Sequence, residues 1–241
     1  MIARFLGIDL GWRSQPSGVC CLEWQGDSLY LLNLDRLAEI AAILHWVDCW
    51  TITTTLIAVD APTIINNPTG MRLPDRLTHR YFRQYHAGCY PANLGRPFAH
   101  RTVSFGRALE ARGFAHAPQI EPQSSGKYQI EVFPHPAIVH LFGLDRILKY
   151  KKGKLNERKQ ELSKLKYYIE TILCHREPQL KLTRSLPAIP DKGTDLKILE
   201  DQLDSLICAY VGAHWWYWGS AKNLTLGNRE TGYIIVPQLI P

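Results

Sequence analysis

The sequence lacks any apolar run close to the ~20 residues needed to cross a bilayer, so we expect no membrane-spanning segment. The opening apolar stretch is short and ends at Asp9, which predicts no signal peptide and a cytoplasmic location. The six cysteines form no CxxC pair and no spacing typical of metal ligands, so we expect reduced and mostly buried thiols. Internal repeats are missing as well.

What the chain does contain is enough apolar material for one substantial core. Apolar residues make up 46% and charged residues 21% of the 241 residues, a balance typical of globular proteins. No clear second domain is visible, so we predict a single domain over residues 1–241. Within it, we expect a helical and loop insertion at about 61–106 and a basic helical segment at about 146–175. The net charge of +6 favours an anionic partner.

The first part of the chain predicts a sheet of neighbouring strands. Apolar runs predict strands at 3–9, 18–24 and 29–34, and their short connections predict an antiparallel meander. Apolar residues at helical spacing then predict a helix over 35–50, with Asp35 as its N-cap. A fourth strand at 54–60 should return parallel to the first and lie beside it.

The remainder predicts alternating helices, loops and a fifth strand. Prolines interrupt residues 61–106, which we expect to pass over the carboxyl edge of the sheet, where open α/β sheets tend to carry their sites. Periodicity predicts helices at about 75–87, 103–113, 136–141, the second half of 146–166 and 195–218, with strands at 128–133 and 233–236. Residues 176–194 show no periodicity and predict a linker.

Acidic residues interrupt these apolar elements at particular points. Asp9 and Asp60 end two strands that we expect to be adjacent, about 4.8 Å apart, so both carboxylates can bind one cation. Glu131 lies in the fifth strand, and Asp201 and Asp204 share one side of the last helix. Clustered carboxylates need a compensating cation, and an oxygen-only ligand set favours Mg²⁺ or Mn²⁺. We therefore predict a metal site, with two ions and with Asp9, Asp60, Glu131 and Asp204 as catalytic residues.

Several of these residues have a structural interpretation as well. Asp9 could cap a turn, Glu131 could pair with an arginine from 72–107, and His135 could be a proton shuttle or an ordinary loop histidine. The 61–106 stretch mixes arginines with aromatic residues, which suits nucleic-acid binding as well as an amphipathic helix. From it we select Arg80, and from the basic segment Lys151 and Lys152, as substrate contacts, together with His135.

Four motifs together resemble a known family. Gly7-Ile8-Asp9-Leu10-Gly11, Val59-Asp60-Ala61-Pro62, residues 131–136 and residues 201–206 are similar to motifs of the predicted RNase H-like nuclease family, domain of unknown function 429. The resemblance implies a ribonuclease H-like α/β fold: a five-stranded mixed sheet, ordered 3-2-1-4-5, with helices on both faces. It also implies acids at the positions of Asp9, Asp60 and Asp204, and a family-specific acid at Glu131.

Three functions are compatible with these patterns. The first is a metal-dependent nuclease that hydrolyses phosphodiester bonds of DNA or RNA. The second is an ATP-dependent sugar or acid kinase of the actin-like type, because Gly7-Ile8-Asp9-Leu10-Gly11 resembles the first phosphate loop of that superfamily. Those enzymes duplicate the domain, and 241 residues leave no room for two copies. The third is a non-catalytic nucleic-acid-binding module.

Overall fold

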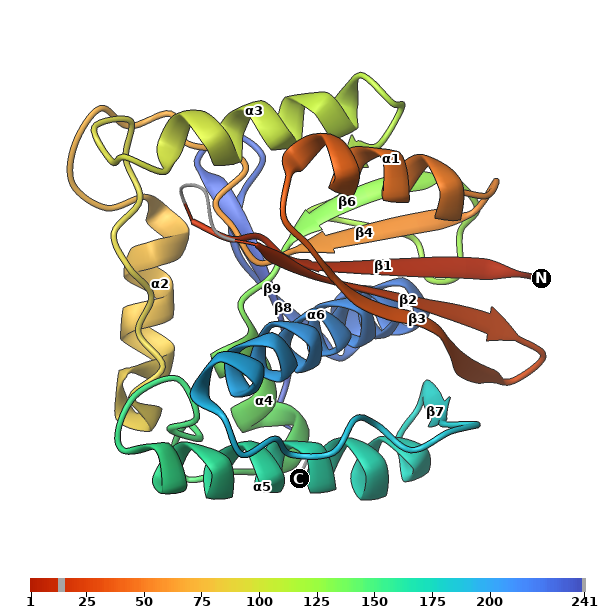
Figure 1. The fold of residues 1–241 in the computed structure, drawn as a ribbon. Coiled ribbons are helices and arrows are strands. Elements are labelled where there is room, and N and C mark those ends of the chain that lie inside the picture. The colour runs from red at the N-terminus through yellow and green to blue at the C-terminus, as the bar shows by residue number, and fades with distance from the viewer. Residues whose placement is uncertain (13–15, 240–241) are drawn as a thin grey trace.

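A mixed sheet of seven strands forms the centre of the computed structural model, which describes residues 1–12 and 16–239 (Figure 1). Its order is β5-β6-β4-β1-β2-β3-β7, with β2 antiparallel to both neighbours and the other pairs parallel. The strands are β1 (Ala3–Asp9), β2 (Ser17–Gln25), β3 (Ser28–Leu37), β4 (Thr55–Val59), β5 (Ala115–His116), β6 (Lys127–Glu131) and β7 (Gln179–Lys181).

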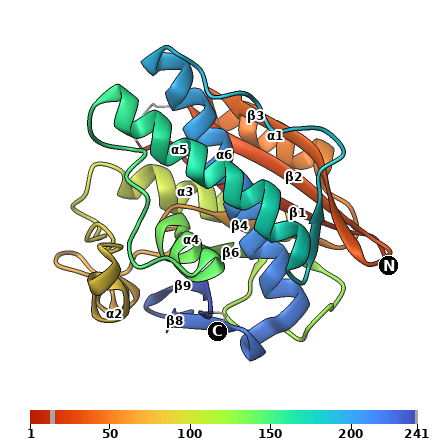
Figure 2. The ribbon, with the colours of Figure 1, turned by 90° about the horizontal axis from the view of Figure 1, so that it is seen from below.

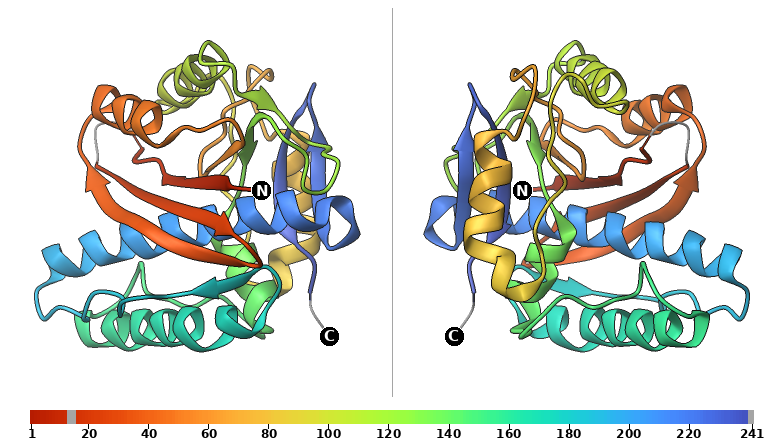
Figure 3. Two further views of the ribbon diagram at one scale, coloured as in Figure 1. Left: turned by 90° about the vertical axis from the view of Figure 1, so that its right-hand side faces the viewer. Right: turned by 90° about the vertical axis from the view of Figure 1, so that its left-hand side faces the viewer.

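Helices cover both faces of this sheet. One face carries α1 and α3, while α6 crosses the other face with α4 and α5 packed outside it; α2 stands at one side (Figures 1 and 3). Seen from below, α5 and α6 lie over the strands (Figure 2). The helices are α1 (Ile40–Trp50), α2 (Leu73–Phe82), α3 (Ala99–Glu110), α4 (Pro134–Phe142), α5 (Leu155–Ile172) and α6 (Gly193–Trp218). Three short 3₁₀ turns occupy Arg83–Tyr85, Leu173–His175 and Gly219–Ala221.

The last two strands form a separate hairpin. β8 (Asn223–Asn228) and β9 (Gly232–Pro237) pair antiparallel with each other, and Ile235 makes one isolated bridge to Val132. This hairpin packs beside α2 and the start of α4, and His140 Nδ1 lies 2.8 Å from the Pro237 carbonyl oxygen. Within the described residues no helix is long and apolar enough to span a membrane.

Strand alternation explains the two apolar layers. Phe5 packs in the core on the α6 side, whereas Leu6 and Ile8 pack on the α1 and α3 side. Because side chains alternate along a strand, Asp9 falls on the same face as Phe5. The same alternation in β4 places Ala58 on the α6 side, and Asp60 two residues later follows it. Both aspartates therefore end their strands on the face that α6 covers.

Glycines allow α6 to lie directly on the sheet. A Cβ atom at Gly7 would lie 1.9 Å from the Ser205 carbonyl oxygen, and one at Gly18 would lie 1.9 Å from the Asp201 carbonyl oxygen. Any side chain at either position would push the helix away. The glycine that precedes Asp9 in the first motif is thus the reason why α6 comes close enough to bring its own acids to the end of β1.

The predicted fold is confirmed with differences at its edges. The core order β3-β2-β1-β4-β6 is the predicted ribonuclease H-like arrangement, and β6 is the predicted fifth strand. The sheet has seven strands rather than five, because the short β5 and β7 extend its two edges. The 176–194 linker supplies β7, which pairs with β3 over three residues, too few for periodicity to be visible.

One local prediction was wrong. Asp35 does not cap a helix: it lies in β3, which continues to Leu37, and α1 begins at Ile40 after Glu39 as N-cap. Leu37 and Ile40 both pack against the core of α1 and the sheet, so apolar spacing alone did not reveal where the strand ended. The strand predicted at 233–236 is present as β9, and it pairs with β8 in the separate hairpin.

Candidate metal and nucleic-acid site

The ends of β1 and β4 open into a cavity of about 790 Å³. Gly7 and Ile8 lie opposite Ala58 and Val59 in parallel register, and Asp60 N donates to the Ile8 carbonyl oxygen at 2.8 Å. Asp9 and Asp60 come directly after this paired register, and both line the cavity. Among the described residues, no hydrogen-bond donor or basic side chain binds either carboxylate.

Asp204 lies directly behind this pair and is fully buried. The close packing of α6 at Gly7 carries it there, and its side chain is 0% exposed. Tyr150 Oη donates to Asp204 Oδ1 at 2.6 Å. Lys151 Nζ lies 2.7 Å from Asp204 Oδ2 and forms an ion pair with it. Two consecutive residues thus occupy the two oxygens of one carboxylate.

The segment that carries Lys151 is anchored at several points. Tyr150 is fully buried in the core on the α6 side, and Arg158 Nε donates to its carbonyl oxygen at 3.0 Å. Arg158 also pairs with Glu200 at 3.3 Å, which ties α5 to α6. Lys149 N donates to Glu161 Oε2 at 3.1 Å. These contacts fix the backbone around Lys151, so its ammonium group is placed by the fold.

Burial and crowding make ionisation of the strand-end acids costly. Burial raises the pKa of Asp9 well above its usual value; Asp204 and Asp60 add to the shift, and Lys151 opposes it. Burial likewise raises the pKa of Asp60 to about 7, with Asp204 adding and Lys151 opposing. Burial alone would lower the pKa of Lys151, but the same three carboxylates raise it well above its usual value. Lys151 is therefore charged. The negative charge that the three carboxylates would carry when ionised is larger than the positive charge of this lysine.

A divalent cation fits this charge pattern and this ligand chemistry. Carboxylate oxygens are the ligands that Mg²⁺ and Mn²⁺ prefer, and Asp9 and Asp60 supply them without a competing partner among the described residues. In the described part of the chain, no three His, Cys, Asp or Glu side chains form a ready-made metal group. Asp204, the third acid, already has Tyr150 and Lys151 as partners. The residues present therefore suit an ion held by two carboxylates.

Glu131 belongs to a different buried network. Arg72 binds it through both guanidinium ends, at 2.6 Å to Oε1 and 2.8 Å to Oε2, and also binds Asp75 at 2.9 Å. Asp75 Oδ2 accepts from the backbone N–H groups of Arg72 and Ala92 as well. Burial alone would lower the pKa of Arg72, but Glu131 and Asp75 raise it above its usual value. Of the two interpretations of Glu131 given by the sequence, the structure therefore shows the one in which it pairs with an arginine from 72–107.

The other selected residues are divided between the cavity and the surface. Asp201, His135 and Lys152 line the cavity together with Lys151. Asp201 is already paired, with Arg36 at 2.8 Å and with Lys197 at 2.7 Å. Arg80 does not line the cavity; it is exposed on α2, with its guanidinium 5.8 Å from the Tyr81 ring centre.

His135 faces the cavity as an uncharged base. Burial lowers its pKa to about 4, with Lys151 adding to the shift, so the imidazole is neutral at pH 7. Its Nδ1 has no hydrogen-bond partner among the described residues. The ring centre lies 5.7 Å from that of Tyr150. A neutral imidazole has one unprotonated ring nitrogen, which can accept a proton.

Aromatic side chains form one wall of the cavity, and sequence reasoning missed the first of them. Trp12 is 41% exposed and Tyr90 is 64% exposed, and both line the cavity. Trp12 packs edge-on to Tyr90 at 5.8 Å and against the buried Phe98 at 4.4 Å. Trp12 follows Asp9 by three residues, which is the only sequence signal that could have drawn attention to it.

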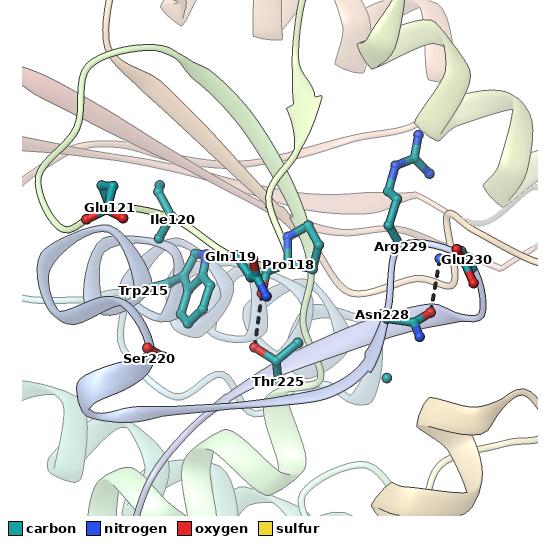
Figure 4. Close-up of a pocket in the computed structure, with 11 residues that line it drawn as sticks. Pro118, Gln119, Ile120, Glu121, Trp215, Ser220, Thr225, Asn228, Arg229 and Glu230 are labelled. Atoms are coloured by element: carbon teal, nitrogen blue, oxygen red, sulfur yellow. Dashed lines mark hydrogen bonds between the residues drawn. The ribbon is translucent and has the colours of Figure 1, made fainter.

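A second cavity of about 860 Å³ lies between the 118–121 loop, the C-terminal part of α6 and the β8–β9 hairpin (Figure 4). Thr225 Oγ1 donates to the Pro118 carbonyl oxygen there, at 3.2 Å. Its charged residues are Glu121, Arg229 and Glu230, and Arg229 already pairs with Glu110 at 2.7 Å. It contains none of the acids selected from the sequence. Although it is slightly larger, the candidate site is the cavity at Asp9 and Asp60.

Two solved structures are similar to this chain at low level. RuvC from T. thermophilus, in complex with Holliday junction substrate, is 9% identical with a TM-score of 0.34, covering 88% of this chain and 97% of RuvC. The human cytomegalovirus terminase nuclease domain, Mn soaked and inhibitor bound, is 10% identical with a TM-score of 0.30. The match covers 86% of this chain and 81% of the terminase domain. Similarities this low say nothing about the chemistry of this chain. No curated protein matches it.

A family model covers nearly the whole chain. It is described as protein of unknown function (DUF429) and matches residues 7–230, from the glycine before Asp9 to the turn of the last hairpin. The match contains all four motifs on which the sequence resemblance depended. The chain therefore belongs to the DUF429 family.

Proposed function

We propose that this protein is a metal-dependent nuclease that hydrolyses phosphodiester bonds of DNA or RNA. The observation that carries the proposal is the pair of strand-end carboxylates, Asp9 and Asp60, which face a large cavity without a partner among residues 1–12 and 16–239 and with Asp204 behind them. A protein gains no stability from ionisable groups held in this way. Their arrangement is explained if a divalent cation and a phosphate complete it.

Each residue then has a role in the reaction. Asp9 and Asp60 would hold Mg²⁺ or Mn²⁺, which when bound polarises a phosphate oxygen and lowers the pKa of a coordinated water. Lys151 and Lys152 face the same cavity and provide positive charge for the substrate phosphate. His135, a neutral imidazole that lines the cavity, would accept the proton from the attacking water.

The aromatic wall supports a nucleic acid as the substrate. Trp12 and Tyr90 are exposed aromatic side chains that line the cavity together with Asp9 and Asp60, and Lys149, Lys151 and Lys152 line it as well. Bases stack on exposed aromatic rings regardless of sequence, and lysines follow the phosphate backbone. Arg96 lies 5.5 Å from the Tyr90 ring centre and adds positive charge on the aromatic side. These features suit a strand whose bases are unpaired at the cavity.

The remaining sequence-derived acids act outside the metal centre in this proposal. Glu131 and Asp75 hold Arg72, and this network keeps β6 and α2 together beside the cavity. Asp201 orients Arg36 and Lys197 at the cavity rim. Glu131 and Asp201 could bind a cation only after losing a basic partner.

The test is cleavage of single-stranded and branched DNA and RNA with Mg²⁺ or Mn²⁺, comparing the wild type with Asp9→Asn. We expect cleavage that requires metal and falls by at least about 10³-fold in the variant. Unchanged activity in Asp9→Asn would contradict the assignment of Asp9 to the active site. Salt-dependent binding without turnover would instead favour a binding module, and thermal stabilisation by ATP would favour a kinase.

A further inference from the structure

Lys151 stands where a second cation would be expected. Its ammonium group lies 2.7 Å from Asp204 Oδ2, and the cavity that it lines is the one shared by Asp9 and Asp60. Asp204 Oδ1 accepts the Tyr150 hydroxyl proton at 2.6 Å. A metal ion bridging Asp204 would therefore have to displace Lys151 from one oxygen or Tyr150 from the other.

The local charge balance points in the same direction. When ionised, Asp9, Asp60 and Asp204 contribute three negative charges, and Lys151 contributes one positive charge. Asp201 does not enter this balance, because Arg36 and Lys197 neutralise it, and Arg72 likewise holds Glu131. Two negative charges remain, which one divalent cation neutralises. Mg²⁺ is commonly bound by one or two carboxylates together with substrate phosphates.

The fold has fixed Lys151 in this position. Tyr150 is buried in the core, and its carbonyl oxygen accepts a hydrogen bond from Arg158, which is itself held by Glu200. A surface lysine that met Asp204 by chance would not need this anchoring. The ammonium group is a compact point charge, the property needed to replace a cation beside a carboxylate.

We propose that the site binds a single divalent cation between Asp9 and Asp60, and that Lys151 is the built-in second cation, paired with Asp204. The inference rests on the proposed function, since it concerns the same metal centre. It replaces the two-ion arrangement expected from the sequence. Tyr150 is then a positioning residue, because it holds both Asp204 and the backbone of Lys151.

The experiment counts bound Mn²⁺ per chain by calorimetry and by electron paramagnetic resonance, without substrate. We expect one ion in the wild type, none in Asp60→Asn, and two in Lys151→Met, where removal of the ammonium group frees Asp204. Lys151→Arg keeps the positive charge and should stay at one. Two ions in the wild type, or one in folded Lys151→Met, would overturn the proposal while leaving the proposed nuclease intact.

A second measurement does not depend on any variant folding. One isolated Mn²⁺ gives an uncoupled six-line spectrum, whereas two ions ~4 Å apart give the broadened spectrum of a coupled pair. We expect the uncoupled spectrum from the wild type at saturating Mn²⁺, and a coupled spectrum would overturn the inference. No Mn²⁺ binding by the wild type or by Lys151→Met would contradict the metal-dependent function itself, which separates the two failures.

Discussion

Two clusters of buried carboxylates lie side by side in this protein, and they are built in opposite ways. In the first, Glu131 and Asp75 surround Arg72, and each of the four carboxylate oxygens accepts a hydrogen bond. In the second, Asp9 and Asp60 face a cavity with no basic partner among the described residues, and Lys151 binds only Asp204. The first cluster is complete as folded, whereas in the proposed function a cation completes the second.

The contrast separates stability from function in neighbouring residues. Glu131 and Asp60 end adjacent parallel strands, since Ala58 and Val59 pair with Ile130 and Glu131. Their sequence settings are alike, with an apolar run that reaches an acid. What distinguishes them is an arginine 59 positions before Glu131 in the chain. The same strand-end acid thus serves as a structural partner in one case and as a candidate ligand in the other.

The largest expected effect comes from breaking the complete cluster. Arg72→Met would leave Glu131 and Asp75 buried without a counter-charge, which costs about 3–5 kcal/mol of unfolding free energy. Urea unfolding of the two proteins measures the loss. The matched control is Arg112→Met, which removes a more exposed pair with Asp48 and should cost less than about 1 kcal/mol. Equal losses in the two variants would contradict the contrast.

A carboxylate-to-amide change should alter the free energy of unfolding in opposite directions in the two clusters. The pKa of Asp60 is about 7 in the native state, raised by burial from 3.8, so the native state retains a proton that the unfolded chain has lost. Native stability therefore falls as the pH rises from about 4 to 7. Asp60→Asn removes this cost and should stabilise the metal-free protein at pH 8 by up to about 4 kcal/mol.

The extra stability of Asp60→Asn should shrink as the pH is lowered toward 4. Mn²⁺ should stabilise the wild type but not Asp60→Asn. Glu131→Gln is the counterpart in the complete cluster, where the loss of a charged acceptor for Arg72 should destabilise the protein at the same pH. Thermal unfolding between pH 4 and pH 8, with and without Mn²⁺, provides the comparison. If Asp60→Asn were less stable than the wild type at pH 8 without metal, the second cluster would be structural after all.

The aromatic wall should matter for ligand binding but little for stability. Trp12→Ala should weaken binding of a single-stranded oligonucleotide by about 1–2 kcal/mol, because one base loses its stacking surface. Binding is measured by fluorescence anisotropy without divalent metal, so that cleavage does not interfere. Tyr167→Ala is the control, since Tyr167 is also an aromatic residue open to solvent, at 61%, but does not line the cavity. The same loss for both variants would remove the wall from the binding site.

Much of this arrangement was predictable from local sequence patterns. Apolar runs at 3–9 and 54–60 predicted both strands and the acids at their ends, because a short apolar run bounded by turn residues is a local feature. The position of Asp204 in the apolar side of the last helix was visible for the same reason. Gly7 and Gly18 belong to the sequence, but their importance depends on the approach of α6, nearly 200 residues later.

The partners of the acids could not be predicted in the same way. Arg72 is 59 positions from Glu131, Arg36 is 165 positions from Asp201, and Tyr150 is 54 positions from Asp204. No local pattern selects one basic residue out of the 28 lysines and arginines as the partner of a given acid. The distinction between a satisfied and an unsatisfied carboxylate therefore required the tertiary structure.

The smallest expected effect tests whether Lys152 adds to the second cluster only as a substrate contact. Lys152 lines the cavity without an ion pair to a described residue, so Lys152→Ala should leave stability unchanged. It should lower the salt dependence of single-strand binding by about 0.7 in the logarithmic slope, the value for one phosphate contact. Lys164→Ala changes the net charge equally but lies on α5 beside Glu161, and should leave the slope alone. Equal slopes for the two variants would mean that overall charge, rather than a phosphate contact at the cavity, attracts the strand.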